Sequence, residues 1–266
     1  MQKRNLLFLL SGLLTWQATR AQETIGYNAI WKKTTADSAE YIVTKTKTDS
    51  GWAVAIRYRS GAPDMMGLYA DDSMKVQMGV FHWWNDKGVE FRSCTFDKGK
   101  ATGPETFFDE RGHVMLKGEN FGGERTGTWT AYFPSGKVAG TAVYKAGKES
   151  SLVLFNEDGT PNKAGKVFEQ DAEFPGGKTE LLRYFNKSLK YPDYAVKHSI
   201  QGTVVVKFRV TRDGQIMDAR VTYTTDKHLN AEALRVIREM PEWKPAVVGG
   251  QPREAIKIQP VVFKLE

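Results

Sequence analysis

The side chains that could act in catalysis are few and scattered along this sequence. The four histidines are His82, His113, His198 and His228. No pair of them has the H-x-x-x-H or H-E-x-x-H spacing, which would place two imidazoles on one helix face for a metal ion. The sequence also has no G-x-S-x-G motif, in which a strained turn exposes a serine nucleophile. These residues therefore predict no metal site and no hydrolase.

Two other features match catalytic motifs only in part. Gly176-Gly177-Lys178-Thr179 has the sequence of the end of a phosphate-binding loop, but Ala172 stands where the first glycine is required. We interpret this stretch as the start of a helix. Cys94 is the single cysteine and has no evident activating partner, so we expect an inert thiol. The sequence predicts no enzyme and no cofactor, which leaves binding as the class of function to consider.

Composition and charge exclude several classes of protein. The chain has 266 residues, of which 41% are hydrophobic and 26% charged, as in ordinary globular proteins. A single cysteine excludes an intrachain disulfide. The formal net charge is +7, but lysine and arginine do not cluster with aromatic residues as in a nucleic-acid groove. We therefore expect no nucleic-acid partner.

The first 21 residues have the pattern of a secretory signal peptide. Lys3 and Arg4 precede an apolar run over residues 6–14, and the small residues Thr19 and Ala21 come before Gln22. The apolar run is shorter than the roughly 20 residues that a membrane-spanning helix needs. We expect cleavage before Gln22 and export of the chain. An uncleaved inner-membrane anchor is the less favoured alternative.

The middle of the chain is a repeat. Three series of positions each recur every 24 residues: Gly79, Gly103, Gly127 and Ser151; Gly88, Gly112 and Gly136; Gly99, Gly123 and Gly147. A fixed period of this length indicates a repeat architecture. Each unit has an aromatic run, a polar turn that ends in glycine, and a second strand-like run, which is typical of a β-hairpin. Residues 79–160 therefore predict hairpins stacked as a long antiparallel meander.

Residues 127–136, Gly-Thr-Trp-Thr-Ala-Tyr-Phe-Pro-Ser-Gly, resemble a bacterial MORN repeat. The resemblance implies a rigid β-structured spacer or docking surface. Residues 22–78 predict more strands without the period, which suits a capping region. The repeated aromatic residues have two interpretations: they fill the buried face of the meander, or they form a stacking surface for a glycan or peptide.

The last hundred residues predict a small α+β domain. We expect a linker over residues 161–170 and then a helix from Pro175 to Tyr191-Pro192, since the residue before a proline leaves the helical region. Alternating apolar residues on both sides of Asp213-Gly214 predict a hairpin. A second helix, with Asn230 as its candidate cap, ends at Pro241, and a last strand covers residues 255–265. This order predicts two helices on one face of a three-stranded antiparallel sheet.

Seven stretches over residues 171–266 carry a second resemblance. They are Glu173-Phe174-Pro175-Gly176-Gly177, Tyr191-Pro192, Gly202, Asp213-Gly214, Glu232-Ala233-Leu234-Arg235-Val236, Met240-Pro241-Glu242-Trp243-Lys244-Pro245 and Gln259-Pro260-Val261-Val262-Phe263. The segment resembles the C-terminal domain of TonB-family energy transducers. The resemblance implies a periplasmic domain that binds the TonB-box peptide of outer-membrane receptors through an exposed edge strand. It also implies inner-membrane proton-driven motor proteins as partners, and it leaves homodimer formation through the last strand open.

Carried onto this chain, the resemblance implies two stretches of peptide-binding residues. They are Ser188, Leu189, Lys190, Tyr191 and Pro192, which would lie alongside the peptide, and Ile256, Lys257, Ile258, Gln259, Val261, Val262 and Phe263 of the edge strand. Pro260 fits this strand because proline lacks a backbone donor and suits a sheet edge. The alternative is that Pro260 protects an edge that binds nothing.

The chain departs from the TonB pattern in its N-terminal part. Transducers of the family have a membrane helix and a long proline-rich linker, whereas six of the ten prolines here fall within residues 171–266. The resemblance therefore supports peptide binding by this chain more strongly than it supports energy transduction. The alternative hypothesis is a non-transducing envelope adaptor, in which the repeats bind another protein or an envelope polymer.

Overall fold

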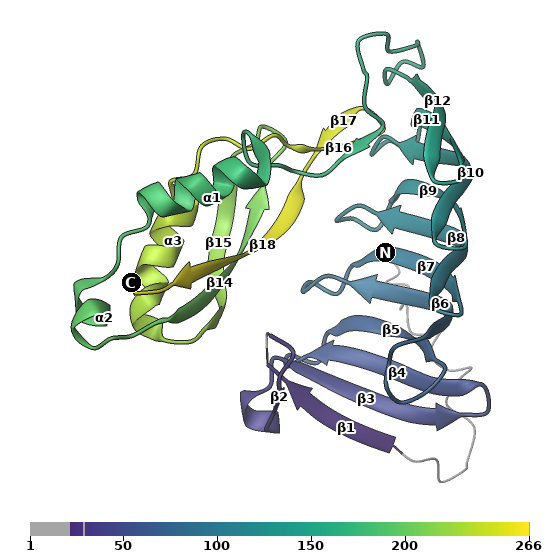
Figure 1. Cartoon of the computed structure of the whole chain (residues 1–266). Helices are drawn as coiled ribbons and strands as arrows, with labels where there is room; N and C mark the ends of the chain where they lie inside the picture. Colours follow the sequence, from purple (N-terminus) through teal and green to yellow (C-terminus); the bar gives the residue numbers. More distant parts are fainter. Residues whose placement is uncertain (1–21, 29, 266) are drawn as a thin grey trace, which may run out of the picture.

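A long antiparallel meander forms the N-terminal part of the computed structural model, which describes residues 22–28 and 30–265 (Figure 1). The predicted signal peptide, residues 1–21, lies outside the described residues. Twelve strands form one sheet in the order β12-β11-β10-β9-β8-β7-β6-β5-β4-β3-β1-β2. They are β1 (Gln22–Tyr27), β2 (Lys33–Thr34), β3 (Tyr41–Thr48), β4 (Gly51–Tyr58), β5 (Pro63–Tyr69), β6 (Gln77–Trp84), β7 (Glu90–Asp97), β8 (Lys100–Phe108), β9 (Val114–Phe121), β10 (Glu124–Tyr132), β11 (Val138–Lys145) and β12 (Lys148–Leu154), with a 3-10 turn, η1, at Ala36–Ser38.

The turns between strands repeat one geometry. The amide of Gly88 donates to the carbonyl of Asn85 at 2.9 Å, and the same bond joins Gly112 to Asp109 at 2.9 Å. Both glycines have a positive φ, 76° and 80°, which a side chain would disfavour. The structure confirms the predicted hairpin meander and extends it through residues 22–78. The MORN identity of the repeats remains a resemblance.

Glycines let this single sheet bury large aromatic rings. Phe81 and Trp129 are fully buried, and each ring lies across a glycine of the preceding strand. A Cβ at Gly67 would lie 2.3 Å from the ring of Phe81, and one at Gly118 would lie 2.3 Å from the ring of Trp129. These strand glycines mark close packing rather than turns. The buried-face interpretation therefore holds for these two aromatic residues.

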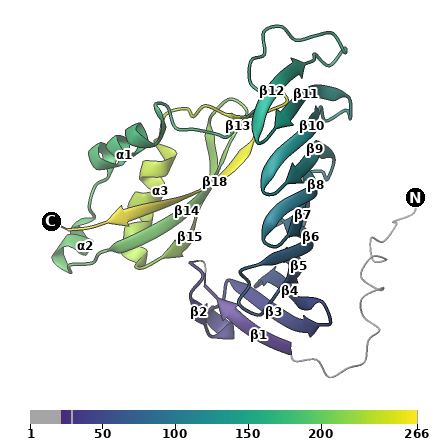
Figure 2. The ribbon, with the colours of Figure 1, turned by 45° about the vertical axis from the view of Figure 1, so that its right-hand side comes forward.

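The C-terminal part is a small α+β domain, and its mixed fold class agrees with the prediction (Figure 2). A three-stranded antiparallel sheet has the order β15-β14-β18. Val204, Val206 and Phe208 of β14 are buried in one core with Leu229, Val236 and Ile237 of the helical side. The elements are β13 (Glu169–Gln170), α1 (Gly177–Ser188), α2 (Asp193–Lys197), β14 (Gly202–Val210), β15 (Ile216–Thr224), the 3-10 turn η2 (Lys227–Leu229), α3 (Asn230–Arg238), β16 (Ala246–Val248), β17 (Gln251–Arg253) and β18 (Ala255–Phe263).

Three details differ from the expectations. The short helix α2, of 5 residues, follows Pro192 and was not expected. Asn230 is not the cap of α3, because it is already helical and its Oδ1 atom has no partner; Asp226 instead accepts from the amide of His228 at η2. Glu169–Gln170, in the stretch expected to be a linker, pair with β16. No helix in the described part of the chain is long and apolar enough to cross a membrane.

The two parts of the chain meet in an apolar joint, which we define by Phe168, Val248 and the Gly249-Gly250 turn of the β16–β17 hairpin. Phe168 and Val248 share a buried cluster with Leu116, Trp129 and Leu154 of the meander. A Cβ at Gly249 would lie 2.5 Å from that of Ala131, so the turn sits directly on the meander. The small sheet β13-β16-β17 therefore fixes the start of β18 to the repeats.

Candidate functional site

The last strand, β18, forms one edge of the C-terminal sheet. It pairs with β14 over its whole length, from Ala255 opposite Val210 to Phe263 opposite Gly202. Within the described residues, no strand pairs with its other side. A strand with one unpaired side presents backbone donors and acceptors that another chain can use. The structure thus places the predicted residues 256–263 on a free sheet edge.

Hydrogen bonds on the far side of β14 reveal which residues of β18 face this free edge. The amide of Thr225 donates to the carbonyl of Thr203 at 3.0 Å, and the amide of Thr203 donates to Thr225 Oγ1 at 2.9 Å, so Thr203 faces β15. In an antiparallel ladder only every second residue bonds a given neighbour. The partner of Thr203 in β18, Val262, therefore belongs to the set that does not bond β14. This set consists of Ile256, Ile258, Pro260 and Val262, and it directs its backbone groups to the free edge.

Pro260 agrees independently with this assignment. Proline has no N–H, so it fits a strand where its nitrogen faces away from the ladder. The carbonyl of Pro260 accepts from Gln259 Nε2 at 2.8 Å. The free edge therefore offers N–H donors at Ile256, Ile258 and Val262, with a gap at Pro260.

The side chains of the same residues form an exposed apolar row, which we define by Ile256, Ile258 and Val262. These three are 54%, 65% and 61% exposed. Val261 and Phe263 alternate with them and are buried towards the helices. Apolar side chains in a row beside unpaired backbone groups create a surface that an extended apolar segment can cover. On the helix-facing side, Lys257 Nζ pairs with Asp171 Oδ2 at 2.7 Å.

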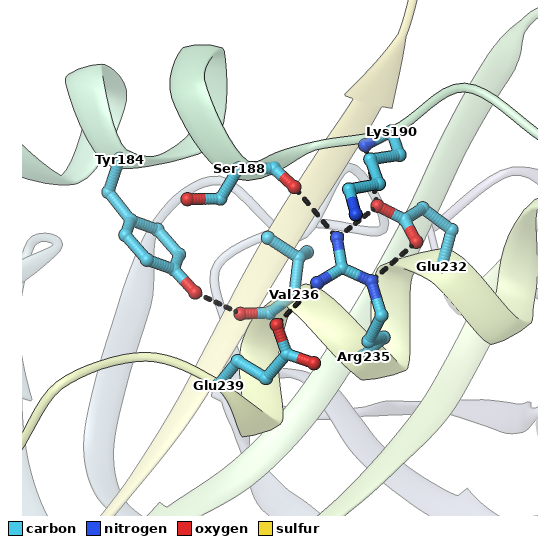
Figure 3. Close-up of polar contacts among 7 residues, drawn as sticks. All are labelled: Tyr184, Ser188, Lys190, Glu232, Arg235, Val236 and Glu239. Carbon is cyan, nitrogen blue, oxygen red and sulfur yellow. Dashed lines mark hydrogen bonds and ion pairs between the residues drawn. The ribbon is translucent and has the colours of Figure 1, made fainter.

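In the second predicted stretch, residues 188–192, Ser188 and Lys190 lie against α3 (Figure 3). The carbonyl of Ser188 accepts from Arg235 Nη2 at 2.7 Å. The amide of Lys190 donates to Glu232 Oε1 at 2.6 Å. Glu232 in turn receives Arg235 Nε on its other oxygen at 2.8 Å. Glu232 and Arg235 of α3 thereby hold the end of α1, because they bond the amide of Lys190 and the carbonyl of Ser188.

Electrostatics reinforce this attachment. Burial opposes ionisation of Glu232, but hydrogen bonds from Arg235 and from the amide of Lys190 keep the pKa of Glu232 below its usual value. The hydrogen bond to Glu232 raises the pKa of Arg235 above its usual value. Arg235 also pairs with Glu239, and the hydroxyl of Tyr184 in α1 donates to the carbonyl of Val236 at 2.8 Å. These contacts hold Ser188 and Lys190 against α3.

Tyr191 connects the two predicted stretches. Its ring lies edge-on to Phe263 at the end of β18, with centroids 5.7 Å apart. Its hydroxyl donates to the carbonyl of Ile200 at 2.5 Å. Leu189 packs against the domain core, and Pro192 precedes α2. The structure thus brings Tyr191 to β18, whereas Ser188 and Lys190 contact α3.

Sequence reasoning assigned no role to the Glu232–Arg235 pair. The two residues appeared there only as part of the family resemblance. Their i, i+3 spacing on a helix was the available signal, because it places an acid and a base side by side. Nothing in the spacing indicated that their partners would be Ser188 and Lys190, more than forty residues away.

Of the residues considered for catalysis, His198 and His228 both stack on the ring of Tyr194, with centroids 4.0 Å and 4.4 Å from it. His82 pairs with Glu90 at 2.7 Å, and His228 pairs with Asp226 at 2.7 Å. Cys94 is fully buried, and burial raises the pKa of its thiol to about 11, which keeps it protonated near neutral pH. No group of three or more histidine, cysteine, aspartate or glutamate side chains among the described residues could hold a metal ion.

Comparison with protein families identifies the C-terminal segment. Residues 187–265 match the family described as the Gram-negative bacterial TonB protein C-terminal. This segment is similar to the TonB C-terminal domain. The match includes α2, β14, β15, α3 and the whole of β18, with its free edge, and it covers less than half of the chain. A search of curated proteins found no match. The TonB-type domain therefore supports a role in transport coupling at the bacterial envelope.

Proposed function

We propose that this chain is a periplasmic TonB-family protein that binds TonB-box peptides of outer-membrane receptors. The peptide adds to the free edge of β18 as a further strand, in support of energy-coupled transport. The observation that carries the proposal is the combination of free backbone groups and exposed side chains at Ile256, Ile258 and Val262.

Strand addition suits this edge in two respects. Main-chain hydrogen bonds supply affinity without sequence demands, and alternate side chains supply specificity. Here both come from the same residues, because Ile256, Ile258 and Val262 present their backbone groups to the edge and their side chains to solvent. A peptide with apolar residues at alternate positions would cover this row, while its other side chains would approach Lys257 and Gln259.

The periplasmic location and the further partners belong to the same proposal. The signal-peptide pattern of residues 1–21 supports export. The TonB C-terminal-type domain supports outer-membrane receptors as peptide donors. Inner-membrane motor proteins would supply force, and the apolar joint would pass it between the domain and the repeats. Homodimer formation through β18 would compete with the peptide, because both use one edge.

Peptide titration of the chain from Gln22, by calorimetry, tests the proposal. Ile258→Pro removes one free-edge donor without removing a bond to β14, so we expect binding about tenfold weaker, from the loss of about 1 kcal/mol and the steric effect of the ring. Ile258→Ala keeps the donor and serves as the matched control for the lost side chain. It should bind more tightly than Ile258→Pro.

Two results would contradict the proposal. One is absence of binding to the wild-type chain at millimolar TonB-box peptide, which would favour the adaptor hypothesis. The other is equal affinity of wild type, Ile258→Pro and Ile258→Ala, which would place the peptide elsewhere on the molecule.

A further inference from the structure

A second contact joins the C-terminal domain to the repeats, far along the chain from the apolar joint. The turn between β6 and β7 points towards the C-terminal domain (Figure 1). Its Asp86 Oδ2 accepts from Lys207 Nζ of β14 at 3.2 Å and also bonds Arg220 of β15. Lys207 and Arg220 are directly opposite each other in the sheet. One carboxylate thus bridges two strands of the C-terminal domain.

The environment favours the charged form of this contact. The side chain of Lys207 is 19% exposed and that of Asp86 is 33% exposed, so solvent screens the pair only in part. Burial opposes ionisation of Asp86, yet hydrogen bonds from Arg220 and Lys207 lower its pKa. The neighbouring Arg209 is already paired with Asp218 and Glu254. Among the described residues, Asp86 is the carboxylate that pairs with Lys207 and Arg220.

The next repeat provides a natural comparison. Glu110 stands 24 residues after Asp86, at the same position of the β8–β9 turn. It is exposed, and it forms no ion pair within the part of the chain that the structure describes. The repeated turn sequence therefore does not by itself create a contact. Asp86 forms the contact because its turn lies beside Lys207 and Arg220 of the C-terminal sheet.

The two contacts differ in physical character. The apolar joint buries Phe168 and Val248 against the repeats, and this burial offers no charge for salt to screen, although Glu169 of the adjoining β13 also pairs with Arg125 of β10 at 2.6 Å. The contact at Asp86 depends on charge, which salt screens over a distance of about 10 Å at 0.1 M and about 3 Å at 1 M. One contact can therefore open while the other holds.

We propose an electrostatic latch formed by Asp86, Lys207 and Arg220. It holds the face of the C-terminal sheet that lies away from the helices against the repeats. The apolar joint stays on the repeats when the latch opens, because its Gly249-Gly250 turn is packed against Ala131 and Leu154 of the meander. The latch engages β14 and β15, whereas the free edge belongs to β18; Lys207 lies directly opposite Ile258 in the β14–β18 pair, but its bond to Asp86 uses none of the free backbone groups of β18. Its closed form therefore leaves Ile256 and Ile258 exposed, at 54% and 65%, and fixes the direction in which the edge faces.

Small-angle X-ray scattering of the chain from Gln22 tests the latch without any peptide, and so independently of the proposed function. At 0.1 M NaCl we expect the scattering profile of wild type to match the one calculated from the structure with the latch closed. Asp86→Asn at 0.1 M, and wild type at 1 M, should show a larger radius of gyration and maximum dimension. Glu110→Gln is the matched control and should scatter as wild type.

Charge reversal separates opening from misfolding. Asp86→Lys should open the chain, and Asp86→Lys combined with Lys207→Asp and Arg220→Asp should restore the compact profile. Circular dichroism should show the same strand content in all variants. A compact profile for Asp86→Asn and Asp86→Lys, or an extended profile for wild type at 0.1 M, would overturn the latch.

Discussion

The ring of Tyr191 lies edge-on to that of Phe263, with centroids 5.7 Å apart and planes at 85°. This contact joins the segment after α1 to the end of the free-edge strand. The hydroxyl of Tyr191 is fixed on the carbonyl of Ile200. The position of β18 therefore depends on a residue more than seventy positions earlier in the chain.

Two replacements of Tyr191 should show how much its hydroxyl and its ring each contribute to stability. Tyr191→Phe removes the hydrogen bond to Ile200 and should lower the free energy of unfolding by about 1 kcal/mol. Tyr191→Ala also removes the ring and should cost about 3 kcal/mol. Urea unfolding followed by circular dichroism measures both. Equal effects of the two variants would show that the ring contact with Phe263 contributes nothing to stability.

Glu232→Gln should destabilise the C-terminal domain by about 2 kcal/mol at neutral pH, because it weakens charged hydrogen bonds to Arg235 and Lys190. The pKa of Glu232 is lower in the folded chain than its ordinary 4.5, so near that pH the unfolded chain binds more protons. The stabilisation is therefore complete above about pH 4.5 and is lost as the pH falls through the folded pKa.

Unfolding of wild type and Glu232→Gln across acidic pH measures this difference. Glu180→Gln is the matched control, because Glu180 pairs with Arg183 on an exposed surface, and it should change stability by less than about 0.5 kcal/mol. A gap between wild type and Glu232→Gln that stays constant down to strongly acidic pH would contradict the assignment.

Gly118→Ala should destabilise the meander by about 1–3 kcal/mol, because its Cβ would lie 2.3 Å from the buried ring of Trp129. Near-ultraviolet circular dichroism of the tryptophans should change in the folded state, since the ring must move. Thermal unfolding gives the stability. An unchanged midpoint and spectrum would mean that Trp129 does not depend on close approach to this glycine.

Proline substitutions at two adjacent positions of β18 should lower the melting temperature to very different extents. Gln259→Pro removes a donor to β14, because Gln259 lies in the set bonded to Val206, and it should lower the melting temperature strongly. Ile258→Pro should leave the melting temperature much closer to that of wild type. Differential scanning calorimetry compares them. The reverse order would show that the ladder assignment of β18 is wrong.

The latch and the peptide edge should be separable in binding. Because Asp86 contacts β14 and β15, Asp86→Asn should leave TonB-box affinity within about twofold of wild type. Calorimetry with one peptide and both proteins measures this. A large loss of affinity in Asp86→Asn would mean that the repeats form part of the peptide site.

Local sequence patterns predicted much of this architecture. The 24-residue glycine series indicated stacked hairpins, and alternation around Asp213-Gly214 indicated the β14–β15 hairpin, because both signals arise between neighbouring residues. The edge residues 256–263 came from the family resemblance, which Pro260 supported.

Contacts between distant residues could not be predicted in this way. Asp86 and Lys207 are 121 residues apart, and nothing distinguishes the Asp86 turn from that of Glu110 until the C-terminal sheet is in place. The strand glycines Gly67 and Gly118 admit the rings of Phe81 and Trp129, and this role also depends on packing between strands. The attachment of Ser188 and Lys190 to α3 likewise depends on tertiary packing.

The most direct test of the central claim is a backbone amide NMR titration of the chain from Gln22 with a TonB-box peptide. If the peptide adds to β18, the amide signals of Ile256, Ile258 and Val262 should shift and gain protection from hydrogen exchange. Those of Lys257 and Gln259, which already bond β14, should change little in protection. Saturable binding without new protection at Ile256 and Ile258 would contradict strand addition at this edge.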